Sequence, residues 1–138
     1  MIYADTSLLL PVYVPEVNSE TAGNVVKEAK EILISDLTVA EFLVGLARKV
    51  KLGTLSQEGA AQVRTAFEQH IAEGYLQRLA FASPHSEAAG QLALQSPVML
   101  RTLDAIHLAL AIEHGATIAT LDGKLAEAAR TMGVEVLP

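Results

Sequence analysis

The chain has 138 residues and a formal net charge of -6 at pH 7; a domain of this length buries about two-thirds of its unfolded surface, so one domain over residues 1–138 is expected. The acidic balance argues against broad electrostatic attraction to nucleic acid, which depends on Lys and Arg, so nucleic-acid binding would need a local basic patch or bound cations. Cysteine is absent, which excludes disulfides and thiolate metal sites.

Short apolar runs alternate with longer amphipathic runs along the chain. The short runs predict buried strands at residues 2–4, 32–34, 79–81, 117–121 and 134–136. The longer runs predict helices at residues 20–30, 39–51, 57–73, 84–95, 103–114 and 123–132. This alternation predicts an α/β fold with a mainly parallel central sheet of about five strands flanked by helices. Ligands of such sheets bind beyond the carboxyl ends of the strands.

No stretch of the chain predicts a secretory signal or a membrane span. The apolar region 103–121 contains two acids and two histidines, and Asp5 interrupts the apolar N-terminal run, which no basic segment precedes. A cytoplasmic protein is expected, and the absence of cysteine is compatible with that compartment. The hydrophobic fraction of 51% and the mean hydropathy of +0.33 indicate apolar surface reserved for another subunit, so we expect a homodimer.

Three aspartates stand at positions where a site could form. Asp5 and Asp122 each directly follow a predicted strand, so they could converge at the carboxyl edge, or each could simply cap a following helix. Asp104 opens the run LDAIHLALAI, in which nearly every other side chain is apolar. The helix dipole contributes only about 0.3–1 kcal/mol to such a residue, so a functional role is favoured for Asp104.

Glu41 and Asp36 have structural explanations of their own. Thr38 and Glu41 fit a capping box at the start of the predicted helix 39–51, and Asp36 could cap the same helix. If three or four carboxylates converged, they would raise one another's pKa values unless a cation neutralised them. Clustered carboxylate oxygens suit Mg²⁺, with Mn²⁺ as a substitute. Convergence of the acids would therefore predict a metal site.

Four stretches cover essentially the whole chain in a recognisable order and spacing: IYADTSLLLPVYVPE, SDLTVAEFLVGLARK, RTLDAIHLALAIEHGATIATLDGKL and GVEVLP. Together they resemble the PIN-domain family, and within it the VapC-like toxins of toxin–antitoxin pairs. The resemblance implies a PIN-like α/β/α sandwich and a Mg²⁺- or Mn²⁺-dependent endoribonuclease. It implies that hydrolysis of RNA, such as tRNA, is inhibited by a small cognate antitoxin. It places the catalytic and metal-binding acids at Asp5, Glu41, Asp104 and Asp122.

The resemblance also assigns supporting roles to neighbouring polar residues. Thr6, Ser7 and Thr120 would hydrogen-bond the carboxylates or the water around a bound cation. Arg101 could contact substrate phosphate, or it could form an ordinary surface ion pair. His107, one turn beyond the third acid, is expected to be a hydrogen-bonded core residue and neither a base nor a ligand.

The densest basic cluster lies where a helix is predicted to end. Arg48, Lys49 and Lys51 follow one another closely there, and cations at a helix C-terminus need no ligand to explain them. They are nevertheless the best candidates to bind RNA, with Lys124 as a further candidate. Aromatic residues make up only 4% of the chain, so recognition is expected to rest on phosphate contacts and RNA shape more than on base stacking.

Two other functions stay open. The chain could be a catalytically inactive PIN-fold module that binds RNA or protein, which metal titration would distinguish because such a module needs no cation. It could also be a phosphotransfer enzyme with Asp5 as nucleophile. Haloacid-dehalogenase-like enzymes, however, carry a second Asp two residues further on, where this chain has Ser7. The complete set of four acids favours the nuclease.

Overall fold

The computed structural model describes residues 1–138 and contains five strands and seven helices. The strands are β1 (Ile2–Ala4), β2 (Ile32–Ser35), β3 (Gln77–Leu79), β4 (Thr117–Ala119) and β5 (Val136–Leu137). The helices are α1 (Thr6–Tyr13), α2 (Ser19–Glu28), α3 (Asp36–Lys51), α4 (Gln57–Ala72), α5 (Ser83–Gln95), α6 (Thr102–Glu113) and α7 (Gly123–Thr131). None of these helices combines the length and the apolar character needed to cross a membrane.

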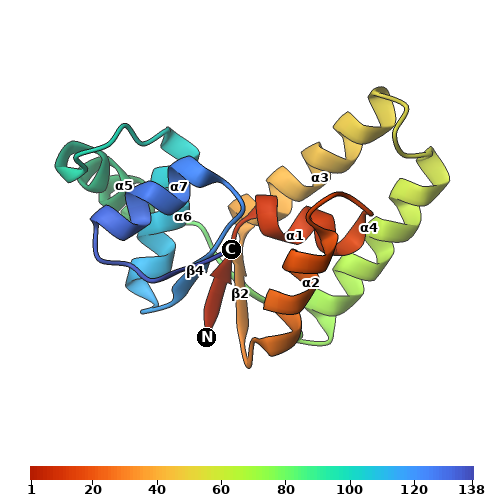
Figure 1. Cartoon of the computed structure of the whole chain (residues 1–138), viewed down its shortest axis with the longest axis horizontal. Helices are drawn as coiled ribbons and strands as arrows, with labels where there is room; N and C mark the ends of the chain where they lie inside the picture. The colour runs from red at the N-terminus through yellow and green to blue at the C-terminus, as the bar shows by residue number, and fades with distance from the viewer.

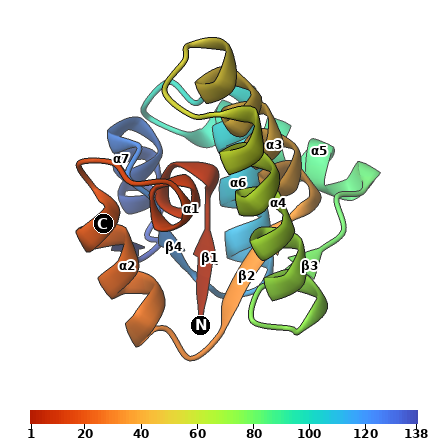
Figure 2. The same cartoon turned by 90° about the vertical axis from the view of Figure 1, so that its right-hand side faces the viewer.

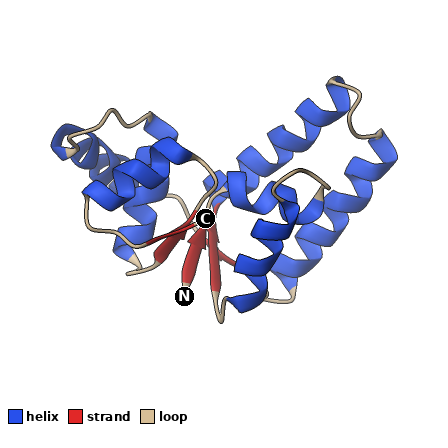
Figure 3. Ribbon diagram, viewed as in Figure 1, coloured by secondary structure: helices blue, strands red, loops and turns tan.

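All five strands pair in parallel, in the order β3-β2-β1-β4-β5. Figure 2 shows β1 between β2 and β4, leading into α1. Helices cover both faces of the sheet, with α1 to α4 on one face and α5 to α7 on the other (Figures 1 and 3). The predicted α/β class and the predicted α/β/α sandwich around a five-stranded parallel sheet are confirmed.

The side chains of β1 divide between two separate hydrophobic cores. Ile2 and Ala4 pack with α1 to α4, whereas Tyr3 between them packs with α5 to α7. This alternation follows from the two-residue period of a strand. Because both faces are covered by helices, β1 is buried along its whole length, which explains why it reads as a continuous apolar run.

Helix α1 is the element that the sequence pattern does not predict. Pro11 lies inside it, and proline is unfavourable within helices. The residues from Leu8 to Val12 are also all apolar, so they show no helical period. Asp5 begins the helix by accepting a hydrogen bond from the Leu8 N–H at 3.1 Å. The chain therefore turns from strand to helix at the acid.

The predictions for three strands are displaced from the observed strands. β3 covers residues 77–79 and not 79–81, β4 ends at Ala119, and β5 covers 136–137 and not 134–136. Leu121 and Val134 lie outside the strands but still pack against the two cores. Apolar runs mark burial, and burial extends beyond the residues that pair in the sheet.

The predicted capping box of Thr38 and Glu41 is wrong, because α3 begins earlier. Ser35 is the N-cap: its Oγ accepts the Thr38 N–H at 3.3 Å, and Thr38 Oγ1 accepts the Ser35 N–H at 3.2 Å. Asp36 is the first residue of the helix and accepts a hydrogen bond from Arg78 Nε at 2.6 Å. Glu41 consequently has no capping role, and its side chain can form contacts with other elements.

An aromatic cluster joins α3 and α4, which project together from the sheet (Figure 1), to α1. The rings of Phe42 and Phe67 stack with their centres 4.0 Å apart, and Tyr13 meets them edge-on at 5.3 Å and 5.6 Å. Both phenylalanines are fully buried. The cluster therefore anchors the projecting pair of helices.

Phe42→Ala is expected to lower the free energy of unfolding by about 3–5 kcal/mol, because it removes a buried ring and leaves a cavity. Urea unfolding followed by circular dichroism measures the change. Val44→Ala on the same helix is the control, since Val44 is 68% exposed; its effect should stay within about 0.5 kcal/mol. Similar losses in both variants would contradict an anchoring role for the cluster.

Candidate functional site

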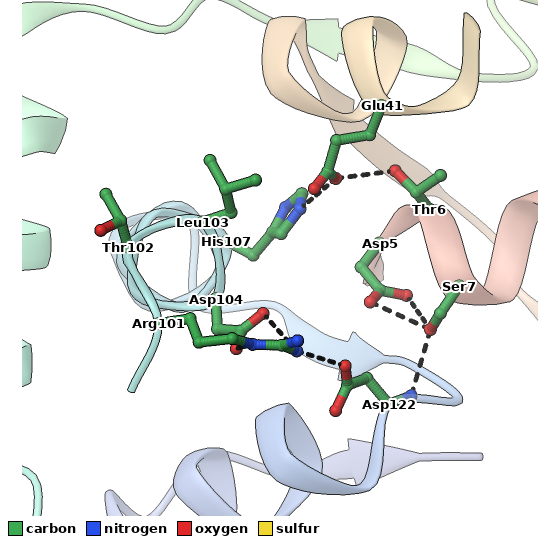
Figure 4. A pocket seen from close by; sticks show the side chains of 10 residues that line it. All are labelled: Asp5, Thr6, Ser7, Glu41, Arg101, Thr102, Leu103, Asp104, His107 and Asp122. Atoms are coloured by element: carbon green, nitrogen blue, oxygen red, sulfur yellow. Dashed lines mark hydrogen bonds and ion pairs between the residues drawn. The ribbon is translucent and has the colours of Figure 1, made fainter. Parts of the chain in front are cut away.

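Four acidic side chains from distant parts of the sequence line one pocket at the carboxyl edge of the sheet (Figure 4). Asp5 follows β1, Glu41 lies on α3, Asp104 lies in the first turn of α6, and Asp122 begins α7. The pocket has a volume of about 340 Å³, and Leu103 is the only hydrophobic residue among the ten that line it. The structure thus brings together the four acids that the sequence singles out.

Asp5 is buried at the centre of a hydrogen-bond network. Its carboxylate accepts hydrogen bonds from Ser7 Oγ at 2.8 Å, from Thr120 Oγ1 at 2.9 Å and from the Leu8 N–H at 3.1 Å. Only 5% of the residue is exposed. Burial is the largest influence on its pKa and raises it, while the hydrogen bonds from Ser7 and Thr120 offset part of this rise.

The directions of these hydrogen bonds require Asp5 to be an acceptor. Ser7 Oγ accepts the N–H groups of Leu121 and Asp122 at 2.8 Å and 3.1 Å, so its own hydrogen is left for Asp5. Thr120 Oγ1 likewise accepts the Asp122 N–H at 3.0 Å and donates to Asp5. The two hydroxyls therefore bind the carboxylate and also hold the loop after β4 against α1.

Glu41 is held by two donors from other helices. Thr6 Oγ1 donates to its Oε2 at 2.8 Å, and His107 Nε2 lies 2.7 Å from the same oxygen. Burial alone would raise the pKa of Glu41, but the hydrogen bond from His107, nearby positive charge and the hydrogen bond from Thr6 together hold that pKa below its usual value. His107 is 2% exposed and hydrogen-bonded, as predicted, but its link to Glu41 is not predicted from the sequence.

Arg101 reaches across the pocket and pairs with two of the four acids (Figure 4). Its Nε donates to Asp104 Oδ2 at 2.7 Å, and its Nη2 donates to Asp122 Oδ2 at 2.6 Å. These carboxylates raise the pKa of Arg101 above its usual value. Its side chain is 58% exposed, so these ion pairs, and not packing, hold it in place.

Asp122 has a second role at the start of α7. Its Oδ1 accepts the N–H groups of Lys124 and Leu125 at 2.8 Å and 3.3 Å. Burial opposes ionisation, but these backbone donors and Arg101 hold the pKa of Asp122 below its usual value. Asp122 therefore caps a helix with one oxygen and faces the pocket with the other.

The donor set fits a hard divalent cation in its chemistry. It consists of carboxylate oxygens supported by hydroxyl groups, with no sulfur ligand. In this conformation no three acidic or histidine side chains lie close enough together to share an ion, and two of the carboxylates are paired with Arg101. A cation would therefore have to compete with Arg101 for Asp104 and Asp122.

Of the basic residues predicted to bind substrate, only Arg101 lines the pocket. Arg48 and Lys49 lie near the C-terminal end of α3, where Lys49 forms an ion pair with Glu16. Lys124 lies in the first turn of α7, outside the pocket lining. The roles of these side chains in substrate binding stay predictions.

Comparison with known proteins gives consistent matches along the chain. The family model described as PIN domain matches residues 2–131. Ribonuclease VapC3 of Pyrobaculum aerophilum is 30% identical over 126 residues, which cover 91% of this chain and 92% of the relative.

Solved structures show the same fold. Mycobacterium tuberculosis VapC20, described as a sarcin–ricin loop cleaving toxin, superposes with a TM-score of 0.75 at 17% identity, over 100% of both chains. A chain of a toxin–antitoxin complex from Klebsiella pneumoniae superposes with a TM-score of 0.72 at 18% identity, over 100% of this chain and 97% of that one.

Ser7→Ala is expected to lower the free energy of unfolding in metal-free buffer by about 1–3 kcal/mol. It removes the acceptor of two backbone N–H groups and a donor to Asp5. Urea unfolding again measures the change. Ser86→Ala, at an exposed position of α5, is the matched control. A Ser7 variant as stable as this control would show that the hydroxyl does not join α1 to the loop after β4.

Proposed function

This chain belongs to the PIN-domain family, and from that premise we propose that it is a VapC-like endoribonuclease that acts as a single domain. It hydrolyses RNA phosphodiester bonds with Mg²⁺, for which Mn²⁺ can substitute. The observation that carries the proposal is the convergence of four carboxylates from four distant segments in one polar pocket. The relative named as a ribonuclease supports RNA as the substrate.

The four acids would hold the cation. Asp5, Asp104 and Asp122 would bind it directly, and Glu41 would bind it directly or through water. The cation, when bound, supplies positive charge that activates water and stabilises the charge developing on phosphate. Ser7 and Thr120 act behind Asp5 as donors that keep its oxygens directed into the pocket.

We expect attack by water and not by the ribose 2′-hydroxyl, by analogy with related nucleases. Attack by water forms a new P–O bond and breaks the P–O3′ bond. The products are then a 5′-phosphate and a 3′-hydroxyl, whereas attack by the 2′-hydroxyl would leave a 2′,3′-cyclic phosphate.

Arg101 would bind the acids and the substrate in succession. In the metal-free protein it neutralises Asp104 and Asp122. When a cation takes over these carboxylates, the exposed guanidinium is released and can bind a phosphate of the RNA through two parallel hydrogen bonds. Arg48, Lys49 and Lys124 would add phosphate contacts outside the pocket. The substrate is structured RNA, with tRNA and the sarcin–ricin loop as the two candidates.

A small cognate antitoxin is the proposed partner, and a homodimer the proposed state of the protein. Large apolar side chains are exposed at several places, including Leu94 at 82% and Met99 at 90%, which indicates surface available to another chain. The Klebsiella pneumoniae complex joins a toxin of this fold to an antitoxin. Both partners and the RNA substrate would meet in the cytoplasm.

RNA cleavage by the purified, partner-free protein should require Mg²⁺ or Mn²⁺ and stop in excess EDTA. Asp104→Asn should lower the rate about a hundredfold or more. The substitution removes a direct ligand of the cation, and the cation lowers the energy of the charged transition state by several kcal/mol. Gel assays on total tRNA and on a ribosomal RNA fragment containing the sarcin–ricin loop measure the rate. Ligation that depends on 5′-phosphate identifies the ends.

Glu127→Gln is the matched control, since it removes one negative charge from an exposed position of α7. Undiminished cleavage in EDTA, or by the Asp104 variant, would contradict the mechanism. If neither cation stabilises the folded protein and no RNA is cut, the inactive binding module becomes the better explanation.

Coexpression of the chain with a small gene next to its own should yield a stable complex, because binding of the partner covers exposed apolar side chains. Affinity purification followed by size-exclusion chromatography with light scattering measures the composition of this complex and the state of the free protein. A gene without any small neighbour, or a free protein that is monomeric at all concentrations, would contradict the corresponding proposal.

A further inference from the structure

The Glu41 carboxylate is fixed to the protein through one oxygen only. Thr6 Oγ1 and His107 Nε2 both bind Oε2, at 2.8 Å and 2.7 Å. No hydrogen bond of the protein reaches Oε1. Figure 4 shows Glu41 directed toward His107 and Thr6 from α3. The two oxygens of this carboxylate are therefore not equivalent, and only Oε1 is free to meet a ligand.

His107 is itself hydrogen-bonded to Tyr3 through its other ring nitrogen. The Tyr3 hydroxyl lies 2.8 Å from His107 Nδ1 and 2.8 Å from Ser35 Oγ. All three side chains are buried, and burial raises the pKa of Tyr3 to about 12, so its hydroxyl keeps its proton. Ser35 caps α3, the helix that carries Glu41. The hydrogen bonds thus form a chain that begins at Glu41 on α3, passes through His107 and Tyr3, and ends at Ser35, the N-cap of α3.

The donor in the hydrogen bond between His107 and Glu41 can be assigned. An ionised carboxylate only accepts hydrogen bonds, so His107 Nε2 must carry a hydrogen. Nδ1, the second ring nitrogen, shares a hydrogen bond with the Tyr3 hydroxyl, which is also hydrogen-bonded to Ser35 Oγ. Ser35 Oγ in turn accepts the Thr38 N–H. Both ring nitrogens of His107 are thus hydrogen-bonded, which holds the ring in its orientation toward Glu41.

We propose that His107, supported by Tyr3, is a positioning residue that limits Glu41 to one oxygen and thereby makes the pocket prefer Mg²⁺ to Ca²⁺. This inference rests on the proposed function, because it concerns the cation of the same site. Ca²⁺ has six to eight ligands and often takes both oxygens of a carboxylate, whereas Mg²⁺ has a smaller octahedral shell that retains several waters. With Oε2 engaged, two-oxygen binding by Glu41 would require the loss of two hydrogen bonds.

Cation affinities of the metal-free protein, measured by titration calorimetry with MgCl₂ or CaCl₂ and without RNA, test this inference. His107→Leu removes one of the two donors to Oε2 and leaves Thr6 as the other. Its preference for Mg²⁺ over Ca²⁺ should fall about tenfold, since loss of a group that orients a ligand typically changes metal affinity by 10–100-fold. His107→Gln places an amide N–H near the position of Nε2 and should keep the preference of the natural protein.

The comparison of the two variants separates positioning from packing, because both lose the buried ring. Equal Mg²⁺ to Ca²⁺ ratios in the natural protein and in His107→Leu would overturn the inference and leave the proposed function intact. Failure of the natural protein to bind either cation would overturn both. If His107→Leu does not fold, Thr6→Val removes the other donor to Oε2 with little change of shape, and an unchanged ratio there would overturn the inference equally.

Discussion

The mutual repulsion of four carboxylates in one pocket is the constraint on which the rest of this site depends. The protein meets it by giving each acid its own positive or hydrogen-bonding partner. Asp5 has two hydroxyls, Glu41 has a histidine and a threonine, and Asp122 has the backbone of a helix start. Arg101 is the only such partner of Asp104, and it also pairs with Asp122. The carboxylate with the fewest partners thus relies on a side chain that is 58% exposed.

Structural and functional explanations of these acids do not compete in this fold. Asp5 and Asp122 both cap helices, which the sequence left as an alternative to a site. Asp122 binds the helix with one oxygen and Arg101 with the other, and Glu41 is fixed through one oxygen in the same way. One oxygen of each therefore orients the side chain, and the second faces the pocket. Because β1 and β4 are parallel neighbours, Asp5 and Asp122 lie at the same edge of the sheet and line the same pocket.

The sequence predicts the sheet from local apolar runs, and it singles out Asp5 and Asp122 because they follow strands and Asp104 because it opens an apolar helix. Glu41 is assigned to the site only by the resemblance to the PIN-domain family. It does not predict α1, because Pro11 and an evenly apolar surface hide the helical pattern. Nor does it predict the contacts of His107, whose partner Tyr3 lies 104 residues away and reaches it only through the packing of one face of the sheet. The available signal was a histidine in an otherwise apolar helix, which shows that a polar partner is needed but not which one. The pairing of Arg101 with Asp104 could be read from their spacing of three residues, but its contact with Asp122 depends on the fold.

The acids of the pocket come from the N-terminal third and the C-terminal third of the sequence. Asp5 and Glu41 lie before α4, whereas Asp104 and Asp122 lie in and after α6. During translation, an N-terminal fragment on the ribosome would therefore carry only half of the ligands, and β1 would lack its neighbour β4. The complete set of carboxylates is therefore present only after synthesis has passed Asp122, and β1 gains its second neighbour at the same stage.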